Sequence, residues 1–132
     1  MRRSGLIVIL LILFCSSLFG QKLCQPKKRA KLPAIYGLTY NAARRKLLVA
    51  GWKPFRSIPE GVFELGTYYG NGGVFWERGY QELEACAGTG RAECSFLFED
   101  KYGNRLRVTT AGEEDPKGKY FARVNGRKFV CE

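Results

Sequence analysis

Four cysteines constrain the fold of this chain more than any other feature. They are Cys24, Cys86, Cys94 and Cys131, an even number that follows an apolar leader. In an oxidising compartment such a set pairs into disulfides. Of the three possible pairings we favour Cys86 with Cys94, which flank a short glycine-containing turn, and Cys24 with Cys131. The second bridge would join the two ends of the domain and contribute about 4 to 5 kcal/mol in the chain-entropy model.

The leader indicates the compartment. Two arginines precede an unbroken apolar run at residues 6–14, and small residues follow up to Gly20. This organisation is typical of a secretory signal peptide, because the run is far shorter than the ~20 apolar residues of a transmembrane helix. Lipidation is disfavoured, because neither Cys15 nor Cys24 follows a small residue. We therefore expect a periplasmic or secreted protein with a signal peptide at residues 1–20.

The remaining chain has the length of one small domain and is basic. Residues 21–31 form a basic arm, either a solvated tail or an electrostatic tether, and residues 32–132 form a single domain. Without Arg2 and Arg3, 20 basic and 12 acidic side chains remain, a net charge of +8. This charge attracts anionic lipid, lipopolysaccharide, wall polymer or acidic protein, but outside the cytoplasm not nucleic acid. Membrane contact is expected only through the cleaved signal peptide or weak electrostatics.

One amphipathic helix is predicted at residues 40–50. Thr39 is a suitable N-cap, apolar side chains recur in steps of four and three, and Gly51 is a typical C-terminal stop. The outer face of this helix is basic. Its cations are Arg44, Arg45 and Lys46.

Residues 32–52, LPAIYGLTYNAARRKLLVAGW, resemble the opening of a PASTA module, a small domain of penicillin-binding proteins and bacterial serine/threonine kinases. The resemblance implies a helix packed on a sheet and binding to peptidoglycan. It identifies no single ligand residue. A second segment, residues 86–112, is similar to small exported proteobacterial proteins and implies no function. The positions that match the PASTA opening without a gap are Pro33, Gly37, Thr39, Ala43, Leu47 and Gly51.

The last third of the chain is predicted to be β-structure. Residues 94–99 alternate in polarity and predict a strand. Residues 100–104 predict a turn that leads to a second strand at residues 106–110, which indicates a hairpin. A second hairpin, with strands at 119–124 and 127–131, is expected around Asn125-Gly126, because this dipeptide favours a type I′ turn. The predicted fold is therefore α+β: one amphipathic helix packed on a mainly antiparallel four-stranded sheet, stapled by disulfides.

Residues 66–79, GTYYGNGGVFWERG, combine five glycines with four aromatic side chains. We predict an irregular loop here, because glycine disfavours a regular helix. Two interpretations remain open. The loop either presents Tyr69, Trp76 and Arg78 to a partner, since such side chains dominate interfaces, or it places Phe75 and Trp76 in the core of the domain.

The sequence offers little for catalysis. The chain has no histidine, which excludes Ser/His and Cys/His nucleophile pairs, and it has no Cys-x-x-Cys pair for zinc. The glycines at 70–73 lack the lysine of a phosphate loop. We therefore predict no enzyme activity, no catalytic residue, no metal and no cofactor. Most of the carboxylates that remain for a glycosidase pair are expected beside turns or at alternating surface positions; the set is Glu60, Glu64, Glu77, Glu82, Glu84, Glu99 and Asp100.

Two functions fit these features. The first is a non-catalytic periplasmic binding module that engages peptidoglycan or a wall-associated protein through a basic face containing Arg44 and Arg45. The alternative is an inhibitor or immunity protein that inserts a constrained loop, 66–79 or 86–94, into a secreted lytic enzyme, with Trp76 and Arg78 as the wedge. The oligomeric state stays open.

Overall fold

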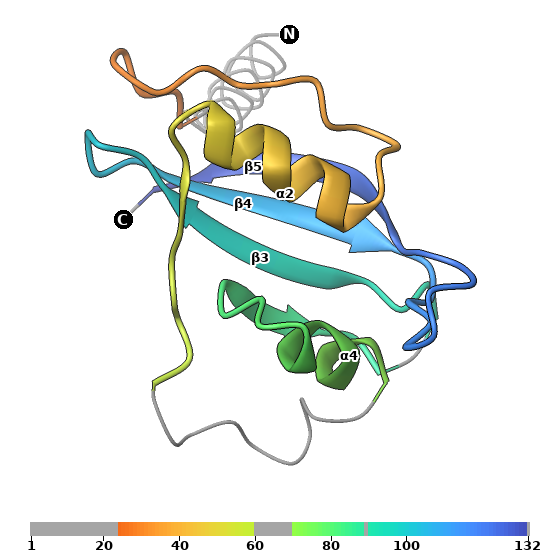
Figure 1. The fold of residues 1–132 in the computed structure, drawn as a ribbon. Coiled ribbons are helices and arrows are strands. Elements are labelled where there is room, and N and C mark those ends of the chain that lie inside the picture. Colours follow the sequence, from red (N-terminus) through yellow and green to blue (C-terminus); the bar gives the residue numbers. More distant parts are fainter. Residues whose placement is uncertain (1–23, 60–69, 89, 132) are drawn as a thin grey trace, which may run out of the picture.

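The computed structural model describes residues 24–59, 70–88 and 90–131, in which two helices lie against one antiparallel sheet (Figure 1). The strand order is β1-β3-β4-β5, and β2 also pairs with β3. The predicted α+β class is confirmed, with five strands instead of four and with a helix that was not predicted. The elements are α2 (Tyr40–Val49), β1 (Lys53–Pro54), α4 (Asn71–Glu77), β2 (Leu83–Cys86), β3 (Cys94–Glu99), β4 (Arg105–Ala111) and β5 (Arg123–Val130).

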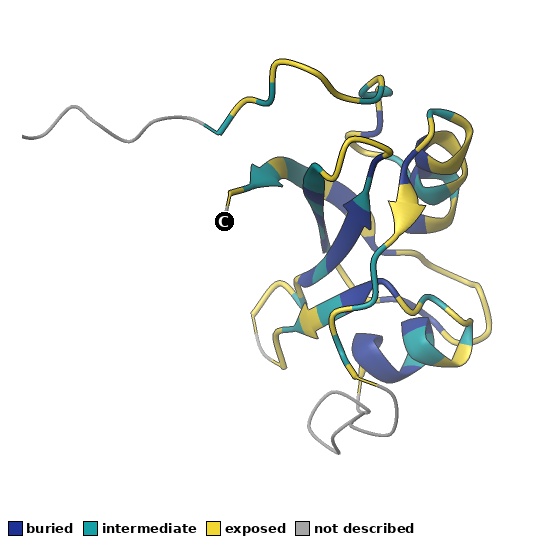
Figure 2. Ribbon diagram, turned by 90° about the vertical axis from the view of Figure 1, so that its left-hand side faces the viewer, coloured by how far each residue is buried: buried dark blue, intermediate teal, exposed yellow. Residues whose placement is uncertain are grey.

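Both helices pack on the same face of the sheet, as Figure 2 shows. The ring of Tyr40 in α2 stacks on Phe96 of β3 with centroids 3.7 Å apart. Phe75 of α4 meets the same Phe96 ring edge-on at 5.0 Å. Alternate residues of β3 and β4 are fully buried beneath the helices, as the period of a strand requires. The result is a two-layer domain with one hydrophobic core.

The structure confirms the N-cap and the helical period that predicted α2. The Thr39 hydroxyl accepts a hydrogen bond from the backbone N–H of Ala42, and the helix ends at Val49. Gly51 follows with a φ of +94°, a conformation that glycine adopts without strain. The next residue, Trp52, is buried, and its indole N–H donates to the carbonyl of Lys31 at 2.9 Å. The end of α2 is thereby tied to the N-terminal arm.

The prediction of an irregular loop is wrong for Asn71–Glu77, which forms α4. Tertiary contacts override the glycine propensity here. The Asn71 amide donates to the carbonyls of Ala92 and Gly112 at 3.0 and 2.8 Å and accepts from the N–H of Glu114 at 2.8 Å. Phe75 is fully buried, so the helix is held at its start and on its core face. Residues 66–69 lie outside the described part of the chain.

The prediction of a second hairpin around Asn125-Gly126 is also wrong. Both residues lie inside the single strand β5, where Gly126 pairs with Thr109 of β4 next to a register shift. A Cβ on Gly126 would lie 2.6 Å from the Thr109 Oγ1. The glycine therefore serves a close approach between strands and not a turn. Residues 112–122, which include most of the expected strand at 119–124, connect β4 to β5.

The cysteines form the two predicted bridges, Cys24 with Cys131 and Cys86 with Cys94. Cys86 and Cys94 are direct partners at the ends of β2 and β3, so their bridge closes the loop between these strands.

Residues 32–39, which join the arm to α2, run along the outer edge of β5. The Gly37 N–H donates to the Val124 carbonyl, and the Val124 N–H donates to the Leu38 carbonyl, both at 2.9 Å. Further back, the Ala30 N–H donates to the Asp100 carboxylate at 2.9 Å. The two bonds with Val124 pair part of an otherwise open strand edge. The bond to Asp100 holds the arm.

Candidate functional site

Basic and acidic side chains are segregated along the chain. Residues 24–59, which comprise the arm, α2 and β1, contain no aspartate or glutamate, and all acidic residues of the chain stand at position 60 or later. Any neutralisation of the arm and α2 must therefore come from elsewhere in the fold or from a ligand. The cations of this segment are Lys27, Lys28, Arg29, Lys31, Arg44, Arg45, Lys46, Lys53 and Arg56.

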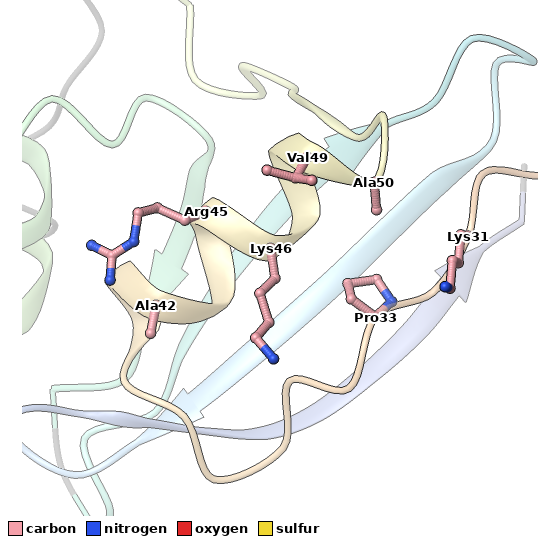
Figure 3. A pocket seen from close by; sticks show the side chains of 7 residues that line it. All are labelled: Lys31, Pro33, Ala42, Arg45, Lys46, Val49 and Ala50. Carbon is pink, nitrogen blue, oxygen red and sulfur yellow. The ribbon is translucent and has the colours of Figure 1, made fainter.

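A groove of about 510 Å³ lies between α2 and the arm, and we call it the α2–arm groove (Figure 3). Ala42, Lys46 and Ala50 stand four residues apart, so they follow one another along the same side of the helix. In Figure 3 the Lys46 side chain extends from α2 toward the arm. Apolar carbon from Pro33 and Ala50 faces the same space. The groove is lined by Lys31, Pro33, Ala42, Arg45, Lys46, Val49 and Ala50.

Three of the lining residues are exposed cations, Lys31, Arg45 and Lys46. In the part of the chain that the structure describes, none of their side chains makes a hydrogen bond or an ion pair. An anion could therefore approach all three without displacing an acidic side chain. Next to Arg45 on the helix, Val49 is 90% exposed. The groove thus combines free positive charge with uncovered apolar surface.

Arg44 and Arg45 are adjacent in sequence but differ in their surroundings. The Arg44 Nε lies 2.6 Å from the Glu82 Oε1, which also accepts from the Tyr40 hydroxyl at 2.7 Å. Burial lowers the pKa of Arg44, but its hydrogen bond and charge interaction with Glu82 outweigh this effect and raise the pKa. Burial, together with Glu82, raises the pKa of Tyr40. Arg44 therefore links α2 to the sheet, and only Arg45 of the two faces the groove.

The expectation of a surface position is wrong for Glu82, which is fully buried, and for Asp100, which is also buried. The Glu82 side chain is the counter-ion of Arg44 beneath α2. The sequence shows Glu82 in a polar context, between Gln81 and an alternating segment, so no local signal distinguishes it from a solvated carboxylate.

The structure does not gather the other predicted binding residues into one site. Arg78 is ion-paired with the buried Glu114 and donates to the Asp115 carbonyl at 2.8 Å. Trp76 is half-buried and packs against the core, with the Arg56 guanidinium 5.6 Å from its ring centre. Tyr69 lies outside the described residues. Among the described residues of this predicted set, Arg45 alone lines the α2–arm groove.

Lys31 and Lys46 belong to separate basic clusters of the sequence, which gives no sign that they lie close together. Their proximity depends on the arm returning across the domain, and this path is set by the Trp52 bond to the Lys31 carbonyl and by the Cys24–Cys131 bridge. No feature of the sequence indicated that Val49 would be exposed beside the groove. The absence of acidic residues from 24–59 is the one sequence feature that could have indicated the surface.

The described residues contain no group of three or more metal-ligating side chains, and none of their helices is long and apolar enough to cross a membrane. Three exposed cations line the α2–arm groove, and its described lining residues include no acidic side chain, so the groove suits an anion. Comparisons with protein-family models, with curated proteins and with solved structures give no match to this chain.

Proposed function

We propose that this protein is a non-catalytic binding module of the cell envelope that engages the cell wall or a wall-associated protein through the α2–arm groove. One observation carries the proposal: Lys31, Arg45 and Lys46 surround the groove as exposed cations with no acidic partner among the described residues. A concentration of positive charge of this kind attracts anions over several ångströms. Export, as the leader predicts, would bring the groove to the anionic components of the envelope.

A polymer with repeated carboxylates or phosphates suits this surface better than a single small anion. Each exposed ion pair contributes only about 0.2 to 1 kcal/mol, and salt screens it over about 10 Å at 0.1 M. Useful affinity therefore needs several contacts at once. The PASTA-like opening contains both α2 and Pro33, which agrees with a wall ligand at this place.

The test is sedimentation of the oxidised protein, residues 21–132, with purified cell wall at low and high salt. We expect retention at low salt and release at high salt. The double variant Arg45→Gln/Lys46→Gln should bind at least tenfold more weakly. Its matched control, Lys117→Gln/Lys119→Gln, removes the same charge from the loop between β4 and β5 and should bind as the wild type does. Equal binding of both double variants would contradict the proposal.

A second candidate, the inhibitor, is favoured by the loop between β2 and β3. Its base is closed by the Cys86–Cys94 bridge and by the Ala87 N–H, which donates to the Glu93 carbonyl at 2.7 Å. The Gly112 N–H donates to the Arg91 carbonyl at 2.8 Å. A loop held in this way loses little entropy on binding, which is how rigid inhibitors gain affinity.

Arg91 is the exposed cation of this loop, whereas Trp76 and Arg78 are engaged within the fold. For the inhibitor we expect a pull-down from periplasmic extract to recover one stoichiometric protein that survives high salt. Arg91→Ala should release it, while Lys117→Ala should not. Recovery that Arg91→Ala leaves unchanged would remove this loop from the candidate interface.

A further inference from the structure

The α2–arm groove has a property that a purely ionic ligand would leave unused. Val49 stands on the outer side of α2, four residues after Arg45, and is 90% exposed. Leu48 beside it is 37% exposed. Pro33 and Ala50 supply further apolar surface to the groove. Cations and bare aliphatic carbon therefore alternate over one short surface, and a complementary ligand has both an anionic and an apolar part.

The same lining argues against a sugar ring as the main contact. A flat aromatic face is a suitable platform for a sugar ring, whereas the described residues that line the α2–arm groove include no phenylalanine, tyrosine or tryptophan. The exposed apolar groups are short and aliphatic. Such groups match hydrocarbon chains and not the polar edges of a glycan.

We propose that the anion held in the α2–arm groove is the phosphate of an envelope lipid, with α2 lying along the surface of an anionic membrane. This inference rests on the proposed role of the groove as an envelope-binding site, and it assigns that site a lipid in place of the wall. Lys31, Arg45 and Lys46 hold the phosphate headgroups, and Val49 enters the boundary between headgroups and acyl chains. Long basic side chains suit this position, because their stems can lie against lipid while their charged ends reach the phosphates.

The geometry of α2 agrees with this orientation. The face of α2 toward the sheet carries Tyr40, Ala43 and Leu47, which are buried and unavailable. The face toward the groove carries Arg45, Lys46 and Val49 within one turn, and α2 contains no acidic residue that an anionic surface would repel. Basic residues near such a surface each add to the attraction within a Debye length.

The experiment measures binding of the oxidised protein, residues 21–132, to phosphatidylcholine vesicles with and without phosphatidylglycerol, and in parallel to purified cell wall. Binding should require phosphatidylglycerol. Val49→Ser should weaken vesicle binding about fivefold through lost apolar contact, and Lys46→Gln should weaken it by a similar factor. The controls Tyr120→Ser and Lys117→Gln change exposed residues of the β4–β5 loop and should bind as the wild type does. An unchanged thermal midpoint shows that each variant is folded.

The outcomes separate this inference from the proposed function. If Lys46→Gln weakens binding to wall and vesicles but Val49→Ser weakens neither, the groove holds an anion without a lipid chain, and only the lipid inference falls. Binding to wall alone also removes only the lipid inference, whereas binding to vesicles alone supports the lipid ligand and removes the wall as the ligand of the groove. If neither variant weakens any binding, the groove is not a ligand site, and both proposals fall.

Discussion

The two helices of this domain lie in opposite ionic surroundings. Around α4, Arg78 is paired with the buried Glu114 and with the Asp115 carbonyl. Around α2, Arg45 and Lys46 have no partner among the described residues. From the sequence alone, Arg45 and Arg78 are equal candidates for binding. Their difference shows that a cation is available to a ligand only where the fold brings it no acid, as at Arg45 and Lys46.

The comparison predicts that charges around α4 stabilise the fold, whereas those of the α2–arm groove serve binding. Arg44 is the exception on α2, because Glu82 reaches it from the segment that enters β2. Substitutions in the two regions should therefore separate the free energy of unfolding from the affinity for a ligand.

The largest effect is expected for Glu114→Ala. This change removes the ion-pair partner of Arg78. It also removes the Glu114 carboxylate oxygen that accepts a hydrogen bond from the Ala122 N–H at 2.7 Å. Removing one partner of a buried ion pair usually lowers the free energy of unfolding by several kcal/mol. We expect a loss of about 3 kcal/mol, at the lower end of this range, because Arg78 is partly exposed. Urea unfolding measures the loss. The exposed neighbour Glu113→Ala is the control and should change stability by less than about 0.5 kcal/mol. Equal effects of the two would contradict the structural role of the charges around α4.

A loss of about 2 kcal/mol is expected for Asn71→Ala. The buried Asn71 amide makes three hydrogen bonds that hold the start of α4 to the loops after β2 and β4, and its removal leaves their backbone groups unsatisfied. Thermal unfolding gives the loss of stability, and amide hydrogen exchange should become faster at Glu114. Asn125→Ala, which removes one exposed bond of 3.1 Å to Glu93, should change little. If both variants unfold alike, the amide of Asn71 does not hold α4.

A smaller effect depends on pH and concerns Asp100, which anchors the arm. Burial raises its pKa, but hydrogen bonds from the Asn104 side chain and from the N–H groups of Ala30, Asn104 and Tyr102 outweigh this and lower the pKa. A group whose pKa is lower in the folded state stabilises the fold above its unfolded pKa of about 3.9, and this stabilisation is lost as the pH falls through the folded pKa.

Asp100→Asn should therefore reduce stability by about 1 kcal/mol at pH 7, and its difference from the wild type should shrink below about pH 4. Urea midpoints measured from pH 7 down to acid give the curve for both proteins. Lys101→Gln, an exposed change in the same turn, controls for altered turn charge. A difference that stays constant with pH would show that ionised Asp100 does not hold the arm.

Local signals predicted much of this fold. The Thr39 cap and the helical period gave α2, the alternation at 94–99 gave β3, and cysteine spacing gave both bridges. Each of these features is specified within a few residues or by a small number of possible pairings. The basic outer face of α2, on which Arg45 and Lys46 are exposed, was also predicted, but the α2–arm groove beside it was not.

The features that the sequence did not reveal depend on distant partners. Helix α4 forms in a glycine-rich segment because Asn71 meets backbone groups some 20 to 40 positions away. Gly126 lies in a strand and not in a turn, and its missing side chain leaves room for the Thr109 side chain on the neighbouring strand. Glu82 is buried because Arg44, on another element, neutralises it. Long-range contacts of this kind override local propensity, and no window of sequence contains them.

The smallest effect on stability, and the sharpest contrast, lies within α2 itself. Arg45→Gln and Lys46→Gln should each change the free energy of unfolding by less than about 0.5 kcal/mol, because neither side chain has a partner to lose within the described residues. Arg44→Gln, the reference in the same helix, should cost about 2 kcal/mol, because it leaves Glu82 buried without its counter-ion. Urea unfolding of the three variants measures the contrast. If Arg45→Gln costs as much as Arg44→Gln, the cations of the α2–arm groove stabilise the fold and are not free for a ligand. If Arg45→Gln leaves the free energy of unfolding unchanged but weakens binding, the cations of the α2–arm groove serve binding and not stability.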